Sequence, residues 1–133
     1  MQSAFLTPLV CQQISEKGNG VWMLHEPLRY VSKLLNGVIT VEAGFVTDFA
    51  SVPRLPITWL LAGGVADRAA VVHDLLVQCE NVCWEVAASV FLEAMEVLGV
   101  PWWRRKPMFW AVLYLGRSHK SNNITLKLEP YMI

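Results

Sequence analysis

The fold is decided by the stretch Trp84–Leu98, WEVAASVFLEAMEVL, in which apolar side chains recur at intervals of three and four residues. This spacing predicts an α-helix with one buried stripe, made of Trp84, Ala87, Ala88, Phe91, Ala94, Met95 and Leu98. Gly99 tolerates a left-handed cap and Pro101 cannot continue a helix, so we expect the helix to end there.

Helices are also expected on both sides of this segment, and strands before them. The apolar spacing predicts one helix from about Ala66 to Gln78 and another from about Arg104 to Leu115. The first forty residues alternate and turn like antiparallel strands, with turn formers at 18–20 and a hairpin dipeptide at Asn36-Gly37. The tail NITLKLEPYMI alternates again and can add a strand.

Strands followed by helices indicate an α+β fold, not a βαβ fold. We therefore expect a small antiparallel sheet from the N-terminal third, extended or not by the C-terminal strand, packed against three helices. The 133 residues fit a single domain, 1–133.

The composition excludes several classes of function. Eleven basic and eleven acidic side chains cancel, so there is no long-range attraction to nucleic acid. No apolar run reaches the roughly 18 residues of a membrane span, and the N-terminus lacks the pattern of a secretory signal. Three cysteines suit reduced thiols better than a disulfide framework. The 54% apolar content and six Trp favour contact with another protein chain, either a different protein or a second copy.

The stretch AAVVHDLLV, residues 69–77, places His73 and Asp74 inside an apolar run. In a functional interpretation His73 is a general base and Asp74 a ligand for a hard cation such as calcium. In a structural interpretation His73 is a buried imidazole and Asp74 pairs with a cation such as Arg54 or Arg68. Buried polar groups more often serve structure, so the structural interpretation is favoured for an isolated pair.

A second candidate stretch is GFVTDFASVPR, residues 44–54, expected as a loop between sheet and helices. Asp48 could supply a further carboxylate for the cation, and Ser51 could act as a nucleophile beside His73. The alternative is a tight turn, in which Asp48 and Ser51 bond neighbouring amides and Arg54 pins the loop by a carboxylate pair.

The segment PWWRRKPMFWAVLYLGR gathers Trp102, Trp103 and Trp110 around Arg104 and Arg105. Aromatic rings and cations together suit a membrane interface. They also suit a protein contact, where Trp and Arg are favoured residues. The protein contact is the preferred interpretation.

FVTDFASVPR, AAVVHDLL and FLEAMEVLGVP together resemble a phage and prophage protein family known as domain of unknown function number 1353. The likeness runs from about Gly44 to Gly116. It implies a viral or prophage gene product and supplies no established activity. The family pattern has a tyrosine where this chain has Val77 and an aspartate where it has Ala88.

More distantly, DRAAVVHDLLV followed by AASVF is similar to the active-site helix pair of phospholipase A-two enzymes. This likeness implies His73 as the base that activates water and Asp74 as a calcium ligand. Ala88 leaves the orienting carboxylate position empty, and Val77 removes a supporting tyrosine. No glycine-rich calcium loop precedes the helix, since Gly63-Gly64 lies too close to it. The site therefore looks degenerate, because loss of such supporting groups lowers affinity or rate roughly tenfold to a hundredfold.

Two hypotheses follow. The first is a phage-encoded virion or tail-associated structural or assembly module with no required cofactor, located in the virion or in the host cytoplasm during infection. The second is a hydrolase of host envelope phospholipid or cell wall, with His73, Asp74, Asp48 and Ser51 as catalytic residues and a divalent cation on Asp74 and Asp48. A host-defence antagonist that binds one bacterial protein cannot be separated from the first by sequence.

Overall fold

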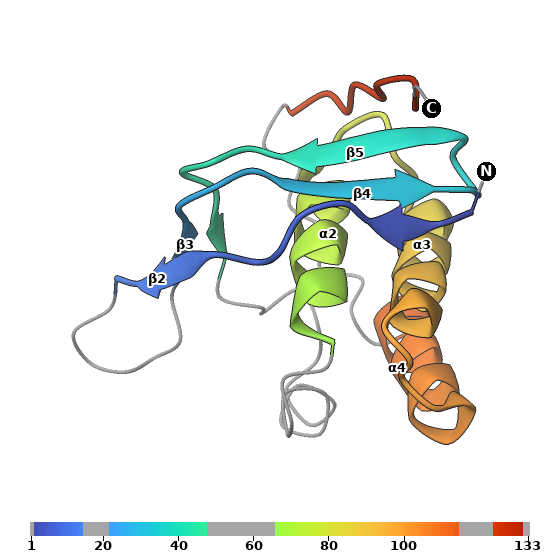
Figure 1. The fold of residues 1–133 in the computed structure, drawn as a ribbon. Coiled ribbons are helices and arrows are strands. Elements are labelled where there is room, and N and C mark those ends of the chain that lie inside the picture. The colour runs from blue at the N-terminus through green and yellow to red at the C-terminus, as the bar shows by residue number, and fades with distance from the viewer. Residues whose placement is uncertain (1, 15–21, 48–65, 115–123, 132–133) are drawn as a thin grey trace.

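The computed structural model describes residues 2–14, 22–47, 66–114 and 124–131, and it confirms the α+β class. Within these ranges, one antiparallel sheet lies over helices α2 (Asp67–Gln78) and α3 (Trp84–Val97), which lie side by side beneath it, and a second small sheet lies beyond one end of the first (Figure 1). Helix α4 (Trp102–Tyr114) packs against α3 at the end farther from the strands (Figure 1). The core lies where α2 and α3 meet the sheet.

The N-terminal strands form two small sheets, where the sequence predicted one. The first sheet has the order β1-β4-β5, with β1 at Ala4–Phe5, β4 at Leu28–Ser32 and β5 at Gly37–Val41. The second has the order β2-β3-β6, with β2 at Cys11–Gln13, β3 at Trp22–Leu24 and β6 at Val46–Thr47. All four strand pairings are antiparallel, as predicted.

The hairpin predicted at Asn36-Gly37 joins β4 to β5. Asn36 has φ 57°, a left-handed conformation that Asn adopts more readily than most residues. At Gly37 the need for glycine is spatial, because an added Cβ would lie 3.1 Å from Leu128 Cβ and 3.2 Å from the Glu129 carbonyl oxygen. The dipeptide therefore makes the turn and also leaves room for the C-terminal segment.

The three described helices match the predicted segments closely. Helix α2 spans Asp67–Gln78, α3 spans Trp84–Val97 and α4 spans Trp102–Tyr114. Gly99 has φ +79°, which is the left-handed conformation expected after α3. Helix α4 begins two residues earlier than predicted, and the Pro101 carbonyl accepts bonds from the Arg104 and Arg105 amides. None of these helices combines the length and apolar composition needed to cross a bilayer.

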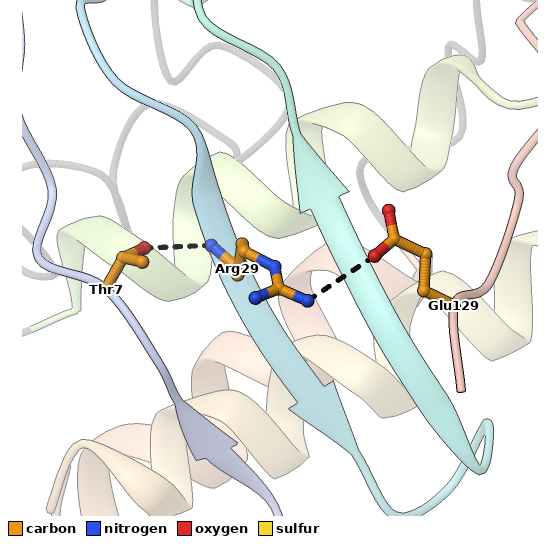
Figure 2. Close-up of polar contacts among 3 residues, drawn as sticks. All are labelled: Thr7, Arg29 and Glu129. Carbon is orange, nitrogen blue, oxygen red and sulfur yellow. Dashed lines mark hydrogen bonds and ion pairs between the residues drawn. The ribbon is translucent and has the colours of Figure 1, made fainter. Parts of the chain in front are cut away.

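The C-terminal segment 124–131 crosses from the helices to the edge of the first sheet without forming a strand of its own. Val38 and Glu129 exchange two backbone hydrogen bonds of 2.7 and 3.1 Å at the edge of β5. Arg29 on β4 reaches over β5 to Glu129 at 3.4 Å, and its backbone amide donates a 2.9 Å hydrogen bond to Thr7 Oγ1 on the other side (Figure 2). Both charged groups are largely in water, so this ion pair stabilises the fold little.

Helix α3 is fixed to the hairpin by one side chain, Glu93. Its Oε1 accepts hydrogen bonds from Tyr30 Oη at 2.6 Å and Ser32 Oγ at 2.9 Å, and its Oε2 accepts one from the Leu34 amide at 2.9 Å. Tyr30 and Ser32 are fully buried. Burial and the Glu93 carboxylate both raise the pKa of Tyr30, which keeps the phenol protonated as the donor.

Candidate functional site

Helix α2 carries His73 and Asp74 into the interior of the protein. The helix lies under the sheet and against α3, so nearly its whole circumference is covered. Residues 69–77 are all buried, including His73 at 1% exposure and Asp74 at 7%. The pair therefore does not lie on an open surface of the helix.

The imidazole of His73 is packed by aromatic rings. The Phe91 ring lies 4.9 Å from it between centroids, and the Trp84 ring meets it edge-on at 6.5 Å. Nδ1 is buried and has no hydrogen-bond partner within the described residues. Burial lowers the pKa of His73 from 6.5 to about 3, so the ring is neutral at physiological pH. A base with such a low pKa accepts protons poorly. The ring is held in place by packing against Phe91 and Trp84.

The carboxylates of α2 are too far apart to share one cation. Asp74 Oδ1 accepts a hydrogen bond of 3.3 Å from Gln78 Nε2, one turn further along the helix. Asp67 lies at the first residue of α2, about 10 Å from Asp74 along the axis. Its Oδ1 is buried without a partner among the described residues, and burial raises its pKa. Asp67 and Asp74 therefore differ in their surroundings, because Asp74 is hydrogen-bonded to Gln78 and Asp67 Oδ1 is buried without a partner among the described residues.

The part of the chain that the structure describes contains no group of three or more His, Cys, Asp or Glu side chains placed to hold a metal ion. Asp48, Ser51 and Arg54 lie outside the described residues, so their predicted roles stay predictions. Ala88 and Val77, which replace the two supporting polar residues, are buried in the apolar core.

Helix α4 exposes its aromatic side chains to solvent. The predicted contact residues Trp102, Trp103 and Trp110 are 69%, 54% and 50% exposed. The predicted contact residues Arg104 and Arg105 are half-buried, and Arg105 donates a 3.0 Å hydrogen bond to the Val100 carbonyl. The two arginines therefore flank the exposed surface, whose remaining members are Lys106, Pro107 and Tyr114.

The sequence prediction missed Glu93, whose carboxylate accepts three hydrogen bonds, two of them from the fully buried residues Tyr30 and Ser32. The available signal was a single acid beside the apolar stripe of α3, in a helix whose other acids are Glu85 and Glu96. That signal is weak, because acids beside a buried stripe are usually solvated. Glu93 lies on the side of α3 that faces the β4–β5 hairpin, and its hydrogen bonds join the helix to the hairpin.

Comparison with known proteins adds a family to this geometry. The family model described as "Protein of unknown function (DUF1353)" matches residues 22–112, from β3 to α4. The chain belongs to the DUF1353 family. The matched residues include His73, Asp74 and the first eleven residues of α4, so both candidate regions lie within the matched DUF1353 domain.

One curated relative is the "Uncharacterized protein y4jT" of Sinorhizobium fredii, which is 31% identical over 80 residues. The alignment covers 57% of this chain and 23% of the relative, so the DUF1353 chain matches less than a quarter of that protein's length. No solved structure matches the chain.

Proposed function

We propose that this DUF1353 chain is a small phage-encoded structural or assembly module that acts by binding virion or tail proteins, further copies of itself included. The observation that carries the proposal is the solvent face of α4, where four aromatic rings and a proline accompany a single cation. Surface helices ordinarily direct charged and polar residues to water. Clustered Trp and Tyr side chains on a surface are favoured in protein contacts.

The buried His-Asp pair supports the same proposal. His73 is enclosed by Phe91 and Trp84, and the ring of Trp84 donates a 3.1 Å hydrogen bond to the Leu113 carbonyl on α4. The histidine therefore packs against the side chain that fastens α4 to α3. In this account His73 and Asp74 support the helical layer that presents the aromatic face.

Mass spectrometry of purified particles, and counting of particles, test this proposal. We expect the chain in particles made by cells that carry its gene, and a Trp102→Ser, Trp110→Ser variant at least about tenfold depleted, because it removes two exposed contact residues. Leu34→Ser is the matched control, since Leu34 is exposed on the β4–β5 turn, and it should be incorporated normally. Absence of the chain from wild-type particles, with unchanged particle yield when the gene is deleted, would contradict the proposal.

A second candidate function is a hydrolase of host envelope phospholipid or cell wall, with His73 as base and Asp74 as ligand of a divalent cation. The observation in its favour is a neutral imidazole whose Nδ1 lacks a hydrogen bond among the described residues, next to a carboxylate. This candidate predicts calcium-dependent release of fatty acid or peptide fragments by the purified chain, abolished in His73→Ala. Equal release by wild type and a folded His73→Ala variant would end it.

A further inference from the structure

Four of the exposed positions of α4 are placed symmetrically about the middle of the helix. Its six exposed residues are Trp102, Trp103, Lys106, Pro107, Trp110 and Tyr114. Trp102, Lys106, Trp110 and Tyr114 follow each other at intervals of four, so they form one ridge about 18 Å long. Reversing the helix about its middle exchanges position 102 with 114 and position 106 with 110. An antiparallel copy therefore places the four exposed ridge positions on one another, while Trp103 and Pro107 exchange with the half-buried positions 113 and 109.

The ridge carries both halves of a cation–π contact. The rings of Trp110 and Tyr114 are stacked, with centroids 5.2 Å apart and planes 4° from parallel, and together they form a flat aromatic surface. Lys106 is the exposed cation of the ridge, and α4 contains no acidic residue to which it could pair within the helix. An ammonium group is attracted to the face of an aromatic ring, most strongly to Trp.

We propose that a second copy of this chain covers the face, in an antiparallel α4–α4 pair about a two-fold axis. Lys106 of each subunit then lies on the Trp110–Tyr114 surface of the partner subunit, and Trp102 packs on Tyr114 of the partner subunit. Symmetry forms each contact twice, which is the property of a two-fold interface. This inference rests on the proposed function in one respect, that α4 is the contact surface. It adds that the partner on this surface is a second copy of the chain.

The expected complex is weak. A single helix face buries less area than the roughly 800 Å² per partner of a standard interface, so we expect a dissociation constant in the micromolar range. The opposite face of α4 is fixed to the protein through buried Met108, Ala111 and Val112, so the helix meets its copy as a preformed surface. Little ordering is then required on association.

Sedimentation equilibrium of the full chain, from about 1 to 200 μM, tests the inference, with helix content checked by circular dichroism. Wild type should be a monomer–dimer mixture. Trp110→Ala should raise the dissociation constant at least about tenfold, because it removes a large contact ring twice. Lys106→Gln should raise it about three- to tenfold and Lys106→Arg should leave it nearly unchanged, because the cation is lost in one and kept in the other. Leu34→Ser should dimerise like wild type.

A monomer at every concentration would overturn the inference, as would a dimer whose dissociation constant is the same in wild type, Trp110→Ala and Lys106→Gln. Vesicles of phosphatidylcholine and phosphatidylglycerol provide the competing occupant. Binding of a purely monomeric chain to them, lost in Trp110→Ala, would assign the face to lipid and overturn the dimer. A monomeric chain that is nevertheless found in particles would remove this inference and leave the proposed function intact.

Discussion

Lowering the pH from about 7 to about 4.5 is expected to reduce the free energy of unfolding by about 2 to 3 kcal/mol through His73 alone. Its pKa is lowered from 6.5 in the unfolded chain to about 3 in the folded protein, because the ring is buried. Between these values the unfolded chain binds a proton that the folded chain does not bind. This contribution to stability is therefore fully present above pH 6.5 and decreases as the pH falls toward 3.

Urea unfolding at several pH values measures this effect. His73→Leu has nearly the same volume and no titrating group, so its stability should change less with pH than that of wild type by about the stated amount. His25→Gln is the matched control, because it replaces a surface histidine bonded to Gln12 and leaves His73 in place. Identical pH dependence in wild type and His73→Leu would show that the ring is accessible to protons in the folded state.

Replacing Glu93 with alanine is expected to destabilise the protein by about 3 kcal/mol. The substitution leaves the hydroxyl groups of Tyr30 and Ser32 without their acceptor in the interior, and it also releases the Leu34 amide. Unpaired buried donors cost more than the hydrogen bonds themselves contribute.

Thermal and urea unfolding compare Glu93→Ala with two other variants. The double variant Tyr30→Phe, Glu93→Gln removes the phenol donor and the carboxylate charge together. It should destabilise the protein less than Glu93→Ala, because fewer buried groups stay unpaired. Glu96→Ala is the matched control on the same helix; Glu96 is exposed, so the change should stay within about 0.5 kcal/mol. A Glu93→Ala variant as stable as Glu96→Ala would show that the three hydrogen bonds do not fix α3 to the hairpin.

Helices and the β4–β5 hairpin could be predicted because each depends on local pattern. The apolar stripe of 84–98 and its Gly99 end are visible within sixteen residues, and Asn36-Gly37 specifies a turn by itself. The division into two sheets could not be predicted in this way. Strands β1 and β6 have two residues each and pair with distant segments, so tertiary contacts decide their partners.

The burial of His73 was foreseeable in outline, since apolar residues surround it on every side of α2. Its packing between Phe91 and Trp84 depends on how α3 lies against α2, which one helix does not specify. The exposure of Trp110 was predicted from its place in a segment rich in Trp and Arg, but its stacking on Tyr114 was hidden, because periodicity does not specify how two side chains of one helix lie against each other. Glu93 was missed for the reason that its partners lie about 60 residues away.

The central claim is that His73 is a neutral, enclosed structural group. A nuclear magnetic resonance titration of its ring in the full labelled chain, from about pH 8 to about pH 4.5, with and without calcium, tests this claim most directly. The account predicts a neutral imidazole throughout, because burial holds the pKa near 3, and ring signals that calcium leaves unchanged. Protonation with a midpoint near 6.5, together with a calcium-dependent shift of the ring signals, would contradict it and favour the hydrolase.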